Sequence, residues 1–323
     1  MTATVHTTIG MNNETRGLWL GLVGVTVFAL TLPMTRLATG PADAPQLSPW
    51  FITFARVVIA GCLSAVFLLA TRSPLPKPHQ RRPLAIAMLC NALGFPLLLG
   101  LALRQVSSGH AAVLTALLPL ATAAMAAWVL HQRARLGFWL CAVLGSALVV
   151  VFSLLRAWQH SGHFAFELAD LLLLVAMLSA ALGYVYGAQV TPELGAERVI
   201  CWMCLMALPV ALPVAWATWP EHPIQAASWI ALGYVGVFSM WAGFFAWFRG
   251  LAIGGALRVR QVQLLQPFIS ILAAVPLLGE PLEAMTVGFA LAVVGTVFVG
   301  KRLALPAAPP TRTATSHPTQ HPR

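Results

Sequence analysis

The chain has 323 residues, of which 59% are hydrophobic and only 9% are charged. A water-soluble protein of this length cannot cover its surface with so few charges, so the composition excludes an ordinary soluble domain. The net charge of +10 would suit nucleic acid, but no water-soluble module interleaves basic and aromatic residues, and a nucleic-acid partner is therefore excluded.

Ten apolar stretches approach the length of about 20 residues that is needed to cross about 30 Å of hydrocarbon. They are predicted to be helices, because a helix satisfies its own backbone polar groups in lipid. The first stretch is too long for a signal-peptide core and is predicted to be retained. In chain order the stretches are residues 18–37, 49–70, 84–103, 110–130, 136–155, 168–190, 199–219, 229–251, 262–278 and 284–300.

The distribution of positive charge predicts that both termini are cytoplasmic. Fifteen of the nineteen Lys and Arg residues fall in segments on the side of the N-terminus, and only Arg36, Arg104 and Arg156 fall on the other side. Lys and Arg accumulate in cytoplasmic loops. The even number of predicted helices agrees with this orientation.

An internal repeat divides the chain into two halves. Residues 100–119 read "GLALRQVSSGHAAVLTALLP" and residues 250–267 read "GLAIGGALRVRQVQLLQP", so both begin with Gly-Leu-Ala and end at an intramembrane proline. Five predicted helices separate the copies, and an odd number inverts one half in the membrane. The predicted organisation is a cytoplasmic segment, two five-helix repeats and a disordered cytoplasmic tail. Their bounds are 1–16, 17–156, 167–302 and 303–323.

A polar stripe marks the ninth stretch, in "VRQVQLLQPF". Placed on a helix, Arg260, Gln263, Gln266, Pro267 and Ser270 fall within a sector of about 120°. Proline has no N–H, so this sector is predicted to include a free backbone carbonyl at Gln263.

The matching helix of the first half carries Thr115, Pro119 and Thr122 at corresponding positions, with Pro119 predicted to free the carbonyl of Thr115. Two polar stripes entering from opposite faces would meet near the middle, which suits alternating access. The alternative is that these side chains only hold helices together through hydrogen bonds.

Arg56 is the charge placed deepest in an apolar stretch, about eight residues into "PWFITFARVVIAGC". An intramembrane arginine is a functional hypothesis by default, and a guanidinium suits an anionic group such as a carboxylate. The alternative is a structural pair with a helix dipole or with Asp170. None of the nine acidic residues lies clearly at the centre of a stretch, and Asp170 comes closest, so the sequence alone does not show proton coupling.

Other candidate chemistry is sparse. In "MWAGFFAWFRGLA", Trp241 is a candidate solute contact together with Trp19. Cys201 and Cys204 have redox or metal spacing but no second ligand pair, so packing is the favoured interpretation. No paired central carboxylates, HExxH or GxSxG occur, so the protein is predicted not to be an enzyme and to use no metal or cofactor.

Four stretches resemble the EamA-type family of the drug/metabolite transporter superfamily. They are "LSPWFITFARVVIAGCLSAVFLL", "ALRQVSSGHAAVLTALLPLATAAMAAWVL", "LADLLLLVAMLSAALGYVYG" and "FRGLAIGGALRVRQVQLLQPFISILAAVPLLGEPLEAMTVGFALAVVGTVFVG". The resemblance implies ten helices in two inverted repeats, with a central cavity formed by helices one to four and six to nine. It places Arg56, Pro119, Pro267 and Glu280 on family positions, whereas Gln266 stands where the family commonly has Glu.

The sequence therefore predicts an all-α polytopic membrane protein of a bacterial inner membrane. Its predicted function is a secondary transporter that exports small amino-acid-like or drug-like metabolites by alternating access. The alternatives are an uncoupled facilitator and a non-transporting scaffold or receptor. The predicted partners are membrane lipids and a small organic solute, while a homodimer and coupling to protons or another ion stay open. The predicted solute contacts are Arg56, Thr115, Gln263, Gln266, Trp241 and Ser270, with Pro119 and Pro267 as hinges.

Overall fold

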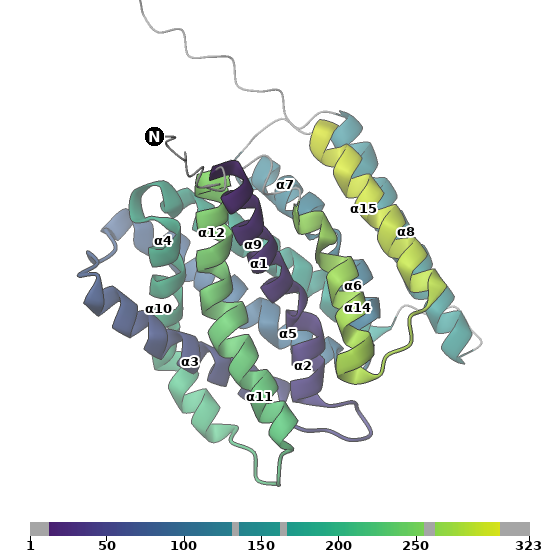
Figure 1. Cartoon of the computed structure of the whole chain (residues 1–323), viewed down its shortest axis with the longest axis horizontal. Helices are drawn as coiled ribbons and strands as arrows, with labels where there is room; N and C mark the ends of the chain where they lie inside the picture. Colours follow the sequence, from purple (N-terminus) through teal and green to yellow (C-terminus); the bar gives the residue numbers. More distant parts are fainter. Residues whose placement is uncertain (1–12, 131–135, 162–166, 255–261, 304–323) are drawn as a thin grey trace, which may run out of the picture.

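The computed structural model describes residues 13–130, 136–161, 167–254 and 262–303, and every regular element within them is helical (Figure 1). Eight helical segments are long and apolar enough to cross a membrane. They are α1–α2 (Asn13–Ala29, Thr31–Thr39), α3 (Pro49–Ala70), α4–η1–α5 (Pro78–Ala87, Met88–Gly94, Phe95–Ala102), α6–α7 (Ser108–Thr115, Leu118–Val129), α8 (Leu136–Ser161), α9 (Leu168–Leu194), α10 (Ala196–Ala217) and α11–η2–α12 (Ala226–Tyr234, Val235–Ala242, Gly243–Gly254).

The last two apolar stretches are also helical but shorter. They comprise η3 (Gln263–Leu265) with α14 (Gln266–Leu278), and α15 (Ala284–Leu303). The chain is thus an all-helical, multi-pass membrane protein, as predicted. The arrangement as ten spans in two inverted repeats stays a prediction.

The helices run between two faces (Figure 1). We call the face where α1 begins and α15 ends the terminal face. The opposite face, which carries the α2–α3, α10–α11 and α14–α15 connections, is the distal face. At one side of the molecule α8 and α15 pack together, and these are the fifth and tenth predicted helices, which the family resemblance implies are peripheral.

The helices of several apolar segments are broken or irregular, and the sequence predicted this only at Pro119 and Pro267. The first segment breaks at Leu30, and Ala116 and Leu117 separate α6 from α7, just before Pro119. Two segments contain π-helices, η1 and η2, which are common at functional sites. The sequence of η2, VGVFSMWA, contains no proline, so its irregular backbone has no simple sequence signal.

The first segment packs closely against the eighth because glycines line the contact. A Cβ added at Gly250 would lie 2.7 Å from the backbone nitrogen of Gly21, a distance that real side chains do not adopt. Small residues at such crossings allow backbones to approach, and in lipid this close packing is a main source of helix association. The contact holds α12, and with it η2, against α1 and α2.

Candidate functional site

Arg56 is buried inside the helix bundle. Its helix, α3, begins where the Ser48 hydroxyl accepts a hydrogen bond from the backbone N–H of Phe51 and Pro49 occupies the first turn. The guanidinium lies two turns further on, and only 3% of the residue is exposed. A charge at this depth costs several kcal/mol unless polar groups surround it, so its neighbours define the site.

One hydroxyl group from another helix contacts the guanidinium, and a second hydroxyl contacts the first. Arg56 Nη2 donates to Ser239 Oγ at 3.3 Å, and Ser239 Oγ lies 2.8 Å from Thr31 Oγ1. Thr31 is the first residue of α2, directly after the break at Leu30, and Ser239 lies in the π-helix η2. The π-helix therefore brings the Ser239 hydroxyl to Arg56, and the break at Leu30 brings the Thr31 hydroxyl to Ser239.

The buried cation has no acidic partner among the described residues. The alternative pairing of Arg56 with Asp170 is wrong, because Asp170 lies 2.6 Å from His110. Within the described part of the chain, the guanidinium thus has unused donor capacity, and its Nε makes no hydrogen bond there.

Further polar groups near this point also lack partners in the described structure. Thr53, Arg56 and Ser64 fall within a sector of about 80° on α3. The Ser64 hydroxyl lies beside the thiols of Cys201 and Cys204, whereas the Thr53 hydroxyl is buried without a hydrogen bond. On α2, Thr35 lies one turn after Thr31 and is in the same state. Buried polar groups are normally paired, so such a concentration is typical of a site for a polar ligand or water.

The Arg56 cluster is defined as Thr31, Thr35, Thr53, Arg56, Ser64 and Ser239. It offers one cation and several hydroxyls in an apolar surrounding. That combination can hold a small solute that has an anionic group and additional hydrogen-bonding groups.

The predicted residues of α14 lie on a neighbouring helix. Helix α14 packs against α2 and α6, and α2 also packs against α3, so α2 connects the predicted stripe with Arg56. Ser270 is fully buried and its hydroxyl has no partner among the described atoms, whereas Gln263 and Gln266 are half-buried. Arg260 lies outside the described residues.

The predicted free carbonyl of Gln263 is wrong. The backbone N–H of Gln266 donates to it, because residues 263–265 tighten into a 3₁₀ turn before α14 begins. Pro267 then occupies the first turn of α14, where a missing N–H costs nothing.

In the first half, Pro119 lies in the first turn of α7, and the chain breaks just before it. The Thr115 hydroxyl donates to the carbonyls of Ala111 and Ala112 in its own helix, at 2.8 and 3.3 Å. The structure thus brings the helices of the two predicted stripes together, α6 against α14, but uses the Thr115 hydroxyl locally.

The two predicted tryptophans differ. Trp241 follows Ser239 in η2 and packs between Phe67 and Phe245, with ring centroids 6.4 and 4.5 Å away, and its indole lies beside the Cys201 thiol. Trp19 is 56% exposed on α1, so it is not packed inside the bundle, and its role as a solute contact stays a prediction. Cys201 and Cys204 pack in an apolar cluster of α10 as free thiols.

Sequence reasoning missed Thr31 and Ser239. A single hydroxyl residue in an apolar stretch is indistinguishable from one that bonds to its own helix, as Thr122 does to the carbonyl of Leu118. Only the position of α2 and η2 beside α3 identifies them.

On the distal face, a carboxylate closes the structure between the two halves. Glu280 follows α14 and accepts hydrogen bonds from the backbone N–H groups of Ser108 and Gly109, at 2.8 and 3.2 Å. It therefore caps the positive end of α6. Glu283, in the same connection, pairs with Arg156 of α8. We call the contacts of Glu280 and Glu283 the distal tie. A cavity of about 280 Å³ lies beside them.

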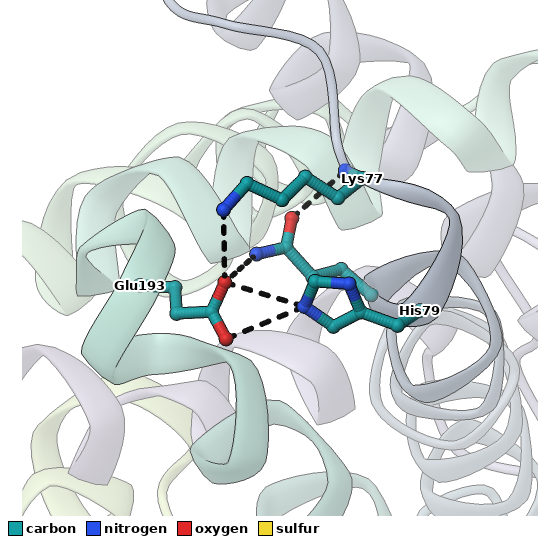
Figure 2. A network of polar contacts seen from close by, with 4 residues as sticks. Lys77, His79 and Glu193 are labelled. Atoms are coloured by element: carbon teal, nitrogen blue, oxygen red, sulfur yellow. Dashed lines mark hydrogen bonds and ion pairs between the residues drawn. The ribbon is translucent and has the colours of Figure 1, made fainter.

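The terminal face has a different contact between the halves. Figure 2 shows the Glu193 carboxylate, at the end of α9, facing Lys77 and His79. It accepts from Gln80 Nε2 at 2.8 Å and lies 3.2 Å from His79 Nε2 and 3.5 Å from Lys77 Nζ. We call these contacts the terminal tie.

These features define a class of protein: a multi-pass helical membrane protein with a cationic polar site buried inside its bundle. The sequence model of the EamA-like transporter family matches residues 15–154 and 167–300. The chain belongs to this family, within the drug/metabolite transporter superfamily, and is a membrane transporter.

The comparison with individual proteins agrees. The Uncharacterized transporter YdeK of Bacillus subtilis (strain 168) is 38% identical over 296 residues, which cover 91% of this chain and 100% of that protein. A crystal structure of a protein with 20% identity has a similar fold, with a TM-score of 0.58 over 90% of this chain and 98% of that one.

Proposed function

We propose that the protein is a secondary transporter that exports small organic solutes carrying an anionic group, by alternating access, from the cytoplasm of a bacterium. The observation that carries this proposal is the burial of Arg56 without an acidic partner among the described residues. A positive charge in lipid is retained only at a cost, and an anionic solute would balance it during transport.

The two family matches support two halves, one in each match. Each half contains five of the ten predicted helices, and five crossings would invert the second half relative to the first. Ten crossings would put both termini on one side, and the excess of Lys and Arg there would make that side cytoplasmic. The terminal face would then be cytoplasmic and the distal face periplasmic or external. The Arg56 cluster draws side chains from both halves, since Ser239 belongs to the second.

Within this proposal the hydroxyls complement the guanidinium. Arg56 would bind the anionic group, while Ser239 and Thr31 would accept or donate hydrogen bonds to the solute after their mutual contact opens. Ser270 and Gln266 on α14, and Trp241 in η2, are the proposed contacts of the remainder of the solute. Pro119 and Pro267 are the proposed hinges, because each begins a helix after a break.

Solute counterflow in proteoliposomes tests the proposal. Proteoliposomes that contain the purified protein are loaded with one unlabelled member of a panel of amino acids, organic acids, nucleosides and sugars. Uptake of the same solute in labelled form is then measured. We expect uptake of one or more anionic members by the unmodified protein. The Arg56→Gln variant should need about ten- to one-hundredfold more solute, because one charge-assisted hydrogen-bonding partner is lost.

The matched control is Arg82→Gln, which removes an exposed arginine from the terminal face. It should transport normally. Gln266→Leu should abolish transport while the protein stays folded. Counterflow by Arg56→Gln with unchanged solute requirement would contradict the proposed site, and counterflow of uncharged members only would contradict the anionic class.

A further inference from the structure

A second buried polar group lies away from Arg56 and plays no part in the solute site described above. His110 Nε2 of α6 and Asp170 Oδ1 of α9 are 2.6 Å apart, and their side chains are 4% and 2% exposed. No other ion pair among the described residues is buried to this degree. The sequence places His110 at the start of one helix and Asp170 at the start of another, with no sign that they meet.

The hydrogen-bond donors around Asp170 indicate that its carboxyl group is ionised. Ser153 Oγ donates to Oδ1 at 3.0 Å, and the backbone N–H of Glu167 donates to Oδ2 at 3.2 Å. A carboxyl group that accepts bonds on both oxygens is stabilised in its ionised form. His110 therefore donates its Nε2 proton to Asp170, and its Nδ1 is the atom at which a second proton binds or leaves.

The surroundings of the pair are apolar. The Phe152 ring lies 5.1 Å from the His110 ring, between centroids, and packs in turn against Phe289 of α15. Phe152 is completely buried in the largest apolar cluster. A His–carboxylate pair in such a setting holds its proton apart from bulk water until the helices move, which is the requirement for a proton relay in a membrane transporter.

The pair lies directly behind the distal tie. Its histidine follows Ser108 and Gly109, whose backbone N–H groups are held by Glu280. Ser153, which bonds to Asp170, precedes Arg156 by one turn of α8, and Arg156 pairs with Glu283. The cavity of about 280 Å³ includes Gly109, one residue before His110. Movement of the α14–α15 connection would therefore affect access to the pair from the distal side.

Other charged groups on the elements around the pair are few. Helices α5, α7 and α14 contribute no ionisable side chain. The charged or titratable groups at the distal end of the remaining elements and connections include Arg36, Asp43, Arg104, Arg156, His160, Glu167, Glu280 and Glu283. Arg156 is engaged by Glu283, Glu280 by α6, and Arg36 donates to the carbonyl of Leu103. Helix α6, which carries the histidine of the pair, has no other ionisable side chain.

We propose that the His110–Asp170 pair is a proton-binding site that couples solute export to the proton gradient. A proton would enter from the distal side and bind at Nδ1 of His110 as the solute leaves. It would be released toward the terminal side when the distal face closes, so one proton moves inward for each solute exported. The N–H bond at Nδ1 forms when the proton binds and breaks when it leaves, and no other covalent bond changes. The inference rests on the proposed transport function, and it adds a coupling site that lies outside the Arg56 cluster.

The first test addresses proton binding without any solute. The full-length protein carries ¹³Cε1-labelled histidine in lipid nanodiscs, and the resonance missing in His110→Gln assigns His110. The resonance is recorded from about pH 5 to pH 9, and we expect its position to change with pH. The pH dependence should differ in Asp170→Asn, because the carboxylate beside the imidazole is lost. His222→Gln, on an exposed connection of the same face, should leave the pH dependence unchanged. A resonance that does not change across this range would overturn the proton site.

The second test addresses coupling, with each labelled member of the solute panel as probe and the membrane potential clamped at zero. If one proton is exchanged for each solute, a pH difference of one unit across the membrane sustains an approximately tenfold ratio of solute concentrations between the two sides. The unmodified protein and His222→Gln should build this solute gradient when a pH difference is applied. His110→Gln should build no pH-driven gradient. It should still perform counterflow, because solute exchange requires no net proton movement.

Three results would overturn the coupling role: a solute gradient that ignores pH in the unmodified protein, a pH-driven gradient retained by His110→Gln, or loss of counterflow together with the gradient in folded His110→Gln and Asp170→Asn. Absence of counterflow in the unmodified protein would contradict the proposed transport function, and with it the coupling role. The NMR experiment would still decide whether the pair binds a proton.

Discussion

The distal and terminal faces are closed by contacts of different kinds. At the distal face, Glu280 is held by two backbone N–H groups at the positive end of α6. At the terminal face, Glu193 meets the long side chains of Lys77 and His79, whose exposed fractions are 68% and 60%, against 49% for Glu193 (Figure 2). Backbone donors are fixed by the helix, whereas exposed side chains lose conformational freedom and are screened by salt.

This difference implies that the distal tie resists opening more strongly than the terminal tie. A transporter with unequal ties would rest with the weaker side open more often. Under the proposed orientation the weaker side is cytoplasmic, which would favour collection of solute from inside the cell. The following predictions test this inequality with two reporter cysteines, one behind each tie. Ile271→Cys lines the distal cavity, and Val190→Cys lies buried one turn before Glu193.

The largest effect is expected for Glu280→Ala. The substitution leaves the N–H groups of Ser108 and Gly109 without their carboxylate, at a cost of about 1–3 kcal/mol to the closed distal face. The reaction rate of Ile271→Cys with a membrane-impermeant maleimide should rise about five- to one-hundredfold. Glu221→Ala, on an exposed connection of the same face, is the control and should leave the rate unchanged. An unchanged rate in Glu280→Ala would show that the carboxylate does not hold this face closed.

A smaller effect is expected for Glu193→Gln at the terminal face. The ion pairs with Lys77 and His79 are exposed and contribute little because solvent competes with them, and a Gln at position 193 still offers an oxygen to the buried Gln80 amide. The reaction rate of Val190→Cys should rise by less than about fivefold. A larger rise than that caused by Glu280→Ala at the distal reporter would reverse the inequality. Ile271→Cys at the distal face is the internal control. Its reaction rate with maleimide should stay the same or fall when Glu193→Gln is added.

The smallest effect is expected from salt on the unmodified ties. At 1 M salt the screening length falls to about 3 Å, which weakens exposed ion pairs but leaves hydrogen bonds to backbone N–H groups largely intact. The maleimide reaction at Val190→Cys should therefore quicken with added potassium chloride, while that at Ile271→Cys changes little. Equal salt dependence at both reporters would indicate that both ties are governed by exposed charge.

Much of the fold follows from the sequence because lipid imposes a simple rule on long apolar stretches. Arg56 was identified from its depth in such a stretch, and its burial agrees. The irregular backbone of η2 was not predictable, since VGVFSMWA contains neither proline nor a polar cluster. Ser239 therefore gave no signal, although it is the residue that meets Arg56.

The errors share a physical cause: the partner of a polar group depends on packing between distant helices. Pro267 removes an N–H, yet a 3₁₀ turn satisfies the carbonyl of Gln263 through Gln266. The predicted alternative partner of Arg56 was Asp170, but α6 brings His110 to it instead. Glu280 matched a family position in the sequence, and only the fold shows that its carboxylate caps α6 across 171 residues of chain.

One measurement tests alternating access between these two ties most directly. Spin labels are placed in a cysteine-free background at two exposed pairs, Gln105 with Leu282 on the distal face and Leu75 with Pro192 on the terminal face. Distances within each pair are recorded by pulsed electron paramagnetic resonance, with and without the solute identified by counterflow. We predict that solute changes the two distance distributions in opposite directions, one pair closing as the other opens. Distributions that stay unchanged, or that move in the same direction on both faces, would contradict alternating access.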